Sequence, residues 1–193
     1  MSVNSMDPAV LKTALMGVVE PILSKMSSIG VSPSQDPQVN EIDIVEYDGR
    51  MRVAGLEKFN SVCFVSAVNF YLSQAEQKQN KVKGAMVLYM DSENGSKIYK
   101  VLGFPVPDDE DDISMMEACG KICKLIGEGF VNALTNSGYT SLVMSEPDNH
   151  KNNIMEGIAF SKEQKKLQEF CFFYWKKKTI AIELTLAAIP MKK

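Results

Sequence analysis

The segment DISMMEACGKICKLIGEGFVNAL, residues 112–134, has the clearest periodic pattern in the chain. Its apolar residues recur every three or four positions, which is the spacing of one face of an α-helix. That face consists of Met115, Met116, Cys119, Ile122, Cys123, Ile126, Phe130 and Leu134. A band of this width covers a β-sheet. We therefore predict a long amphipathic helix from Asp112 to about Leu134, packed on a sheet.

The other side of this helix carries a polar stripe. Glu117, Lys121, Lys124 and Glu128 follow one another at steps of four, three and four residues. A solvated face is the ordinary explanation, because a Glu four residues before a Lys forms a surface pair worth about 0.2–0.5 kcal/mol. A partner-binding surface is the alternative, and these four residues are our candidates for it.

Composition limits the function classes. The chain has 193 residues, 45% of them hydrophobic and 23% charged, which suits one globular domain over residues 1–193. A net charge of −3 argues against nucleic acid, whose binding requires neutralised phosphates. No stretch approaches the roughly 20 apolar residues of a membrane span, and the N-terminus lacks a secretory apolar core. We expect binding to neither nucleic acid nor membrane.

The cysteines indicate the compartment. Four are present, at positions 63, 119, 123 and 171, and most lie in apolar runs. Buried free thiols in a reducing compartment explain this pattern better than disulfides do. We therefore expect a cytoplasmic protein.

A second long helix is predicted near the N-terminus. Asp7 can cap it, Pro8 suits the first turn, and apolar residues repeat every four positions over residues 10–23. Pro21 predicts a kink or a break near Glu20. A loop should follow over residues 30–37.

The remaining elements alternate between extended and polar segments. Strands or extended chain are predicted at residues 42–47, 51–55, 61–72, 84–91, 140–147, 154–160, 169–176 and 179–189. Loops or turns are predicted at residues 73–83 and 148–153. Asn94-Gly95-Ser96 should form a turn before a short helix that Gly103 ends.

An internal repeat relates the two long helices. Residues 20–37 resemble residues 128–147, with Glu20 matching Glu128 and Gly30 matching Gly138. Each copy lies at the end of a helix and continues as extended chain. The repeat predicts halves of about residues 1–90 and 91–193 that share one mostly antiparallel sheet. The predicted fold class is α+β with a two-fold pseudo-repeat.

Common catalytic and cofactor motifs do not occur in the sequence. GxSxG and GxxxxGK[ST] are both missing, and the lone histidine, His150, lies in a polar segment. The acidic run over residues 108–112 lacks the alternate spacing of a calcium loop and fits a helix N-terminus, with Asp112 or Ser114 as the cap. We expect no metal and no cofactor.

The order of three segments resembles the CheC, CheX and FliY group of chemotaxis phosphatases, and the CheX-like branch most closely. KIYKVLGFPVPDDEDD (97–112) resembles that group's short helix and acidic lead-in. EACGKICKLIGEGFVNALTNSGYTSLVMSEP (117–147) resembles its signature helix and the strand after it, and TIAIELTL (179–186) its final strand. The resemblance implies two long antiparallel helices on a sheet and, for the CheX branch, a homodimer.

The chain departs from this group where the group does its chemistry. The group's signature helix carries Glu-x-x-Asn, in which Glu engages the phosphorylated response regulator and Asn orients the attacking water. The resemblance puts Lys121 and Lys124 at these two positions, and Thr13 and Met16 at the equivalent positions of the first helix. An ammonium group donates hydrogen bonds but accepts none, whereas positioning water needs both. We therefore assign no catalytic residue.

The favoured interpretation is a CheX-like signalling protein that binds a CheY-like receiver domain without catalysis. Two alternatives stay open. One is an active phosphatase that acts on a CheY-like response regulator, and the other is a structural α+β domain without a signalling role. If the resemblance holds, Lys121 and Lys124 face solvent, and Cys119, Ile122, Cys123 and Ile126 are buried.

Overall fold

A computed structural model describes residues 5–47, 50–53, 59, 61–105, 111–151 and 164–192. Within them the helices are α1 (Pro8–Ser28), α2 (Gln74–Lys78), α3 (Ser92–Val101) and α4 (Asp112–Asn136). The strands are β1 (Gln35–Tyr47), β2 (Arg50–Val53), β3 (Cys63–Tyr71), β4 (Gly84–Asp91), β5 (Val143–Met144), β6 (Asp148–Lys151), β7 (Lys166–Tyr174) and β8 (Lys177–Leu186). One antiparallel sheet has the order β2-β1-β7-β8-β4-β3-β5, and β6 also pairs with β3. The predicted α+β class is confirmed.

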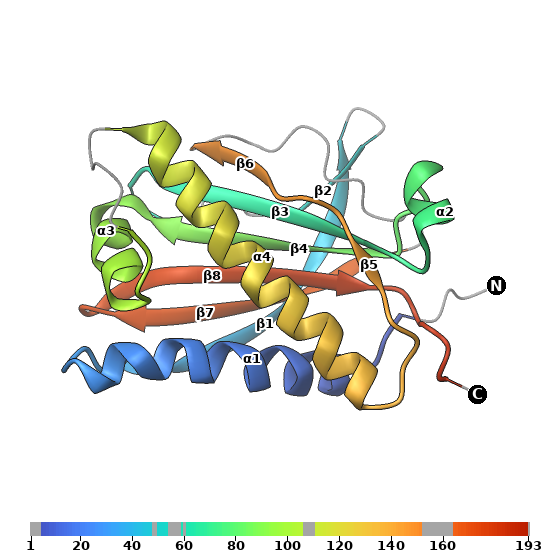
Figure 1. Ribbon diagram of the computed structural model, residues 1–193, viewed down its shortest axis with the longest axis horizontal. Helices are drawn as coiled ribbons and strands as arrows, with labels where there is room; N and C mark the ends of the chain where they lie inside the picture. The colour runs from blue at the N-terminus through green and yellow to red at the C-terminus, as the bar shows by residue number, and fades with distance from the viewer. Residues whose placement is uncertain are drawn as a thin grey trace.

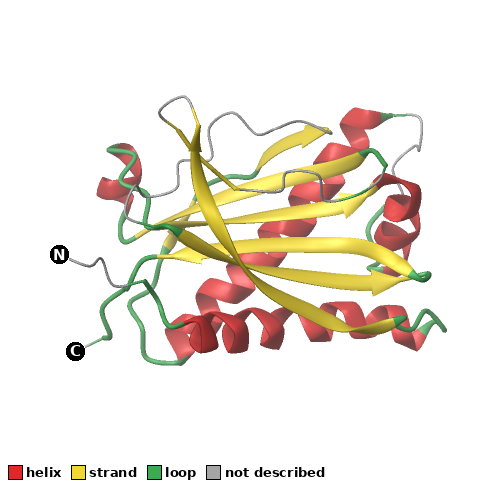
Figure 2. Ribbon diagram, turned by 180° about the vertical axis from the view of Figure 1, so that it is seen from behind, coloured by secondary structure: helices red, strands yellow, loops and turns green. Residues whose placement is uncertain are grey.

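The two long helices cover one face of this sheet. Figure 1 shows α4 crossing the sheet diagonally, while α1 lies along its β7 side. The main core fills the space between helices and sheet, and its fully buried side chains include Leu15, Phe70 and Phe130. The Phe70 and Phe130 rings lie 5.6 Å apart, in a tilted arrangement. From behind, Figure 2 shows the long β1 crossing the opposite side of the sheet. No helix in the described part of the chain has the length and apolar character required to cross a membrane.

Helix α1 begins as its sequence predicts. The Asp7 carboxylate accepts a hydrogen bond from the backbone N–H of Ala9 at 2.8 Å, and Pro8 occupies the first turn. The break predicted near Glu20 is wrong, because the helix continues through Pro21 to Ser28. A proline ring crowds the carbonyl four residues earlier, which here belongs to Gly17. Gly17 is exposed, on the solvent side of the helix, where carbonyl groups tilt outward toward water.

Strand β1 starts earlier than its sequence suggests. It begins at Gln35 rather than at Ile42, so part of the predicted loop is strand. The pairing of β1 with β7 shifts register between Gln35 and Gln38. Pro37 lies in this irregularity, where its missing N–H removes no regular hydrogen bond.

Three polar segments form structure that the sequence did not suggest. Ser73 caps the short helix α2 within the predicted loop, through a hydrogen bond from Glu76 N–H to its hydroxyl. Residues 148–151, also predicted as loop, form β6 on the edge of β3. Trp175 and Lys176, predicted to extend a strand, have positive φ and form the β7–β8 turn. The strand predicted at residues 154–160 lies outside the described residues.

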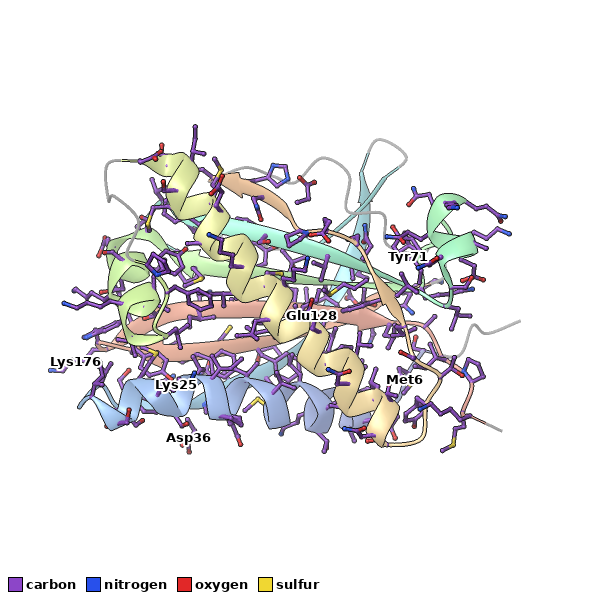
Figure 3. All side chains as sticks on the ribbon, in the orientation of Figure 1. Met6, Lys25, Asp36, Tyr71, Glu128 and Lys176 are labelled. Atoms are coloured by element: carbon purple, nitrogen blue, oxygen red, sulfur yellow. The ribbon has the colours of Figure 1, made fainter. Side chains whose placement is uncertain are left out.

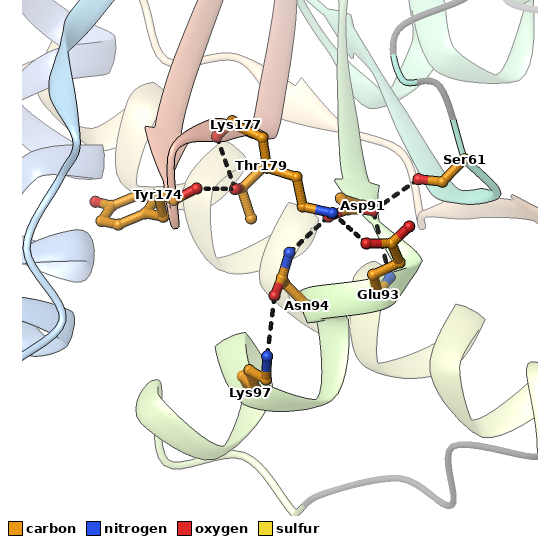
Figure 4. Close-up of polar contacts among 8 residues, drawn as sticks. All are labelled: Ser61, Asp91, Glu93, Asn94, Lys97, Tyr174, Lys177 and Thr179. Atoms are coloured by element: carbon orange, nitrogen blue, oxygen red, sulfur yellow. Dashed lines mark hydrogen bonds and ion pairs between the residues drawn. The ribbon is translucent and has the colours of Figure 1, made fainter.

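Helix α3 begins four residues before its predicted start, because Asp91 caps it. This aspartate is completely buried and accepts hydrogen bonds from Ser61 at 2.9 Å and Asn94 at 2.7 Å. Lys177 at the start of β8 lies 3.1 Å from the same carboxylate (Figure 4). A buried charge is tolerated when it is paired and hydrogen-bonded in this way. The junction therefore joins β4, α3 and the β7–β8 turn.

The capping residue of α4 is Asp111, not Asp112 or Ser114 as predicted. Its carboxylate accepts from Ile113 N–H at 3.0 Å and from the Ser114 hydroxyl at 2.6 Å. The Ser114 hydrogen bond is the main reason that the pKa of Asp111 is lowered. Asp112 instead forms an ion pair with Lys151 on β6. At the other side of this helix end, the buried Tyr99 hydroxyl of α3 donates to the Met115 carbonyl at 3.1 Å.

Candidate functional site: the exposed face of α4

The polar stripe lies on the side of α4 turned away from the sheet. Glu117, Lys121 and Glu128 are exposed, and the Lys124 side chain is 40% exposed. Figure 3 shows Glu128 on this outer face. The opposite prediction also holds: Cys119, Ile122, Cys123 and Ile126 are each at most 3% exposed. Both orientation predictions for this helix are confirmed.

Two glycines bring α4 close to its neighbours. A Cβ atom on Gly127 would lie 2.5 Å from the Met144 sulfur, which follows α4 on β5. A Cβ on Gly129 would lie 2.5 Å from a methyl group of Val18 on α1. Because real side chains do not approach so closely, these two positions set the depth at which α4 lies on the sheet and against α1.

Strand β6 packs closely against the N-terminal half of α4 at a third glycine, Gly120. The Asn149 side chain would lie 2.6 Å from a Cβ at Gly120, and its oxygen accepts a hydrogen bond from Ser66 of β3 at 2.7 Å. The thiol of Cys123 lies 3.4 Å from the Ser66 carbonyl. The chain after α4 therefore lies beside the helix and fixes the orientation of its outer face. The sequence contained no signal for β6, because its residues are polar.

Lys124 is not a free lysine. Its ammonium group donates to both carboxylate oxygens of Glu146, at 2.9 and 2.8 Å. The hydrogen bond to Glu146 is the main cause of a raised pKa at Lys124, to which the nearby Glu128 carboxylate also contributes. Lys124 therefore remains protonated and acts only as a donor. Sequence reasoning missed Glu146 as a site residue, because its partner lies 22 positions away.

A polar hollow of about 450 Å³ lies beside this pair. It is lined by Lys124, Glu128, Val131, Asn132, Ser141, Leu142, Met144, Ser145 and Glu146. The structure thus brings Lys124, Glu128 and Glu146 together. Glu117 and Lys121, the other two predicted residues, lie outside this lining, closer to the start of the helix.

Two exposed apolar residues extend the stripe. Ile113 is 64% exposed and Leu125 is 45% exposed. With Glu117 and Lys121 they form a ridge at steps of four residues, which we call the α4 ridge (Ile113, Glu117, Lys121 and Leu125). Sequence reasoning missed both apolar members, although their spacing from Glu117 and Lys121 was visible. A ridge that combines charged side chains with exposed apolar ones suits protein binding better than a purely solvated face does.

The equivalent positions on α1 carry no charged side chain. Thr13 is exposed, and Met16 is partly buried against the core. The described residues contain no group of three or more His, Cys, Asp or Glu side chains that could hold a metal ion. All four cysteines are buried and none is in a disulfide, and burial raises the pKa of Cys123 to about 12. These thiols belong to the core.

No protein-family model and no curated protein sequence matches the chain. Solved structures do match it over nearly its whole length. A CheC-like superfamily protein from Shewanella sp. PV-4 aligns with a TM-score of 0.58 and 14% identity, over 93% of this chain and 98% of that one. FliY from Thermotoga maritima aligns with a TM-score of 0.56 and 14% identity, over 95% and 92%.

A third match is a complex. In the CheX–CheY–BeF3–Mg2+ structure from Borrelia burgdorferi, the matched chain aligns with a TM-score of 0.52 and 16% identity, over 91% of this chain and 97% of that one. The likeness predicted from the sequence is therefore confirmed at the level of the fold, with CheC-like, CheX and FliY structures all among the matches.

Proposed function

We propose that this chain is a CheX-like signalling protein that binds a CheY-like receiver domain through the α4 ridge and does not catalyse dephosphorylation. The fold likeness supports the family placement, and the complex of a CheX with CheY supports the class of partner. The observation that carries the non-catalytic part is the state of Lys124. In the group that the chain resembles, the residue at this position is the Asn that orients the attacking water molecule.

Hydrolysis of an aspartyl phosphate needs a water molecule held in line with the phosphorus–oxygen bond. A side chain that positions this water must accept one of its hydrogens, as an amide oxygen does. Lys124 has no lone pair for this purpose, because a lysine is an ammonium ion at neutral pH, and the hydrogen bond to Glu146 raises its pKa further. The ammonium group also donates hydrogen bonds to both carboxylate oxygens of Glu146.

The ridge supports binding by other means. Lys121 is exposed beside Leu125, so it can approach an acidic partner surface while the apolar side chain is buried in the contact. Charge pairing at the rim of an interface accelerates association, and apolar anchors supply most of the affinity. The α4 ridge contains both kinds of group.

The internal repeat belongs to the same proposal. We infer one domain over residues 1–193, built from pseudo-repeat halves of about 1–90 and 91–193. Two features support it. The long helices run in opposite senses in Figure 1, and each is followed by a glycine at positive φ, Gly30 at 83° and Gly138 at 92°. A cytoplasmic homodimer, as the CheX branch implies, completes the proposal.

The test is loss of phosphoryl label from a phosphorylated cognate receiver, with and without this protein, combined with a binding measurement. We expect complex formation and an unchanged rate of loss. The double variant Lys121→Glu with Lys124→Asn restores the pair that the resemblance predicts, and should accelerate the loss. Accelerated loss with the unaltered chain would instead favour the active-phosphatase alternative. Absence of any complex would favour a structural domain.

A further inference from the structure

A second hollow lies beside the C-terminal half of α1, on the other half of the molecule from the α4 ridge. Its volume is about 240 Å³. Its lining comes from α1, from the chain that follows α1, and from the end of β7: Glu20, Leu23, Ser24, Ser27, Pro33, Gln35, Pro37, Phe172, Phe173 and Tyr174. Most of these side chains are apolar, and three are aromatic.

The backbone fixes this hollow in place. After α1 ends, Val31 N–H donates to the Met26 carbonyl at 2.8 Å, and Ser34 N–H donates to the Phe173 carbonyl at 2.8 Å. Gln35 then pairs with Phe173, and the register shift before Gln38 places Pro37 at the edge of the hollow. Irregularities of this kind redirect side chains and are frequent next to binding sites.

The charge of the hollow is one-sided. Among the described residues that line it, Glu20 is the one with a charge, and none is a lysine or arginine. Asp36, exposed between two lining residues, adds a second negative charge at the edge. Ser24 and Ser27 belong to the last turns of α1, where the helix dipole is negative. An apolar wall with a negative rim attracts an apolar group that carries a positive charge.

The hollow on α4 is a natural comparison. The sequence repeat pairs Glu20 with Glu128 and Leu23 with Val131, and both hollows include their own member of each pair. The α4 hollow contains its own cation, Lys124, which is bound to Glu146. On α1 the equivalent position is Met16, and the described lining of the α1 hollow contains no cation.

We propose that the α1 hollow binds an organic cation with an aromatic body, of the aralkylammonium class. The ring packs against Leu23, Phe172 and Tyr174, and the ammonium group lies at the rim beside Glu20. This site shares no residue with the α4 ridge, so its test is independent of the proposed receiver binding.

The experiment is an NMR titration of the full chain with two probes that share a body and differ in charge. The probes are phenethylammonium and 3-phenylpropionate, at neutral pH and low salt. We expect saturable shifts at Leu23 and Phe173 with phenethylammonium, and an affinity for it about fivefold higher than for the carboxylate. No saturable shift at these residues, or equal affinity for both probes, would overturn the proposal.

Matched variants distinguish the contribution of the Glu20 charge to binding from that of the space inside the hollow. Glu20→Gln, at an exposed position, should weaken phenethylammonium about threefold, in the range of an exposed ion pair, and should leave 3-phenylpropionate unchanged. Glu128→Gln removes the corresponding carboxylate of the α4 hollow and should change neither. Ser24→Trp should fill the hollow and abolish binding of both. An unchanged phenethylammonium affinity in Glu20→Gln would contradict the assignment of Glu20.

Discussion

Helices α1 and α4 have similar lengths and cover the same face of the sheet, but they are held there differently. The side-chain hydrogen bonds of α1 in the described residues are local: Asp7 caps its first turn, and Ser24 and Ser28 donate to carbonyls three positions earlier. Its attachment to the rest of the fold comes from apolar packing, with Leu15 and Met26 completely buried. Apolar packing has little directional preference.

Helix α4 adds directional contacts to its apolar packing. Four residues from other segments contact polar groups of α4. Tyr99 donates to the Met115 carbonyl, and the Ser66 carbonyl lies beside the Cys123 thiol. Glu146 accepts from Lys124, and Lys151 forms an ion pair with Asp112. At Gly120, Gly127 and Gly129 the neighbouring side chains lie so close that a Cβ atom there would be only 2.5–2.6 Å away. Because α4 has these directional contacts and α1 does not, we infer that the fold fixes the outer face of α4 more firmly than that of α1. A fixed face is the better surface for a specific partner.

The largest effect we expect is on stability, from the same substitution made on each helix. Gly127→Val should lower the free energy of unfolding by about 2 kcal/mol, because the new side chain must displace Met144 and press on Met86 and Val68. Gly17→Val on α1 meets open space and should cost nothing, since valine has the better helix propensity. Urea unfolding of both variants measures the difference. Equal costs would show that α4 has as much freedom as α1.

The next effect concerns binding of the receiver domain. Leu125→Asp puts a charge in the apolar part of the α4 ridge and should weaken receiver binding about tenfold or more, as loss of a central interface anchor does. Thr13→Asp makes the corresponding kind of change at an exposed position of α1 and should leave affinity unchanged. Isothermal titration with both variants decides between the two faces. Weakening by Thr13→Asp alone would move the binding surface to α1.

A smaller effect should come from the contact between α3 and α4. Tyr99→Phe removes the hydroxyl that donates to the Met115 carbonyl and should lower the free energy of unfolding by about 1 kcal/mol. Tyr71→Phe is a suitable comparison, because the Tyr71 hydroxyl donates to Asn80 over a longer distance, 3.4 Å. If both variants unfold alike, the buried hydrogen bond does not hold the start of α4.

The predictable parts of the fold were those in which local pattern and burial agree. The apolar band of α4 and the Asp7–Pro8 start of α1 each depend on residues close together in sequence. Strand β4 was predicted with its observed ends, because the apolar run from Gly84 to Asp91 is buried throughout. For such segments, propensity and tertiary burial favour the same structure.

The sequence failed where distant contacts decide the structure. Polar residues 148–151 became β6 because the edge of β3 offered backbone hydrogen bonds, and no local pattern reports a free edge. Asp91 starts α3 early because Ser61 and Lys177, both distant in sequence, satisfy its buried carboxylate. In the candidate site, too, local features were predictable and distant contacts were not. The stripe on α4 was predicted, whereas Glu146, which accepts the hydrogen bonds of Lys124, was not.

The smallest effect we expect is on the titration of that lysine. The hydrogen bond from Lys124 to Glu146 raises the pKa of Lys124, so the pair stabilises the fold fully below the lysine's unfolded-state pKa. This contribution is lost as the pH rises through the higher folded-state pKa. Glu146→Gln should bring the Lys124 pKa back toward its ordinary value, which an alkaline NMR titration of the lysine side chains can follow. Lys177, whose raised pKa depends first on Glu93, is the internal control and should not change. A Lys124 titration that Glu146→Gln leaves unaltered would mean that the ion pair does not form in solution. Helix α4 would then lose one of the four directional contacts that distinguish it from α1.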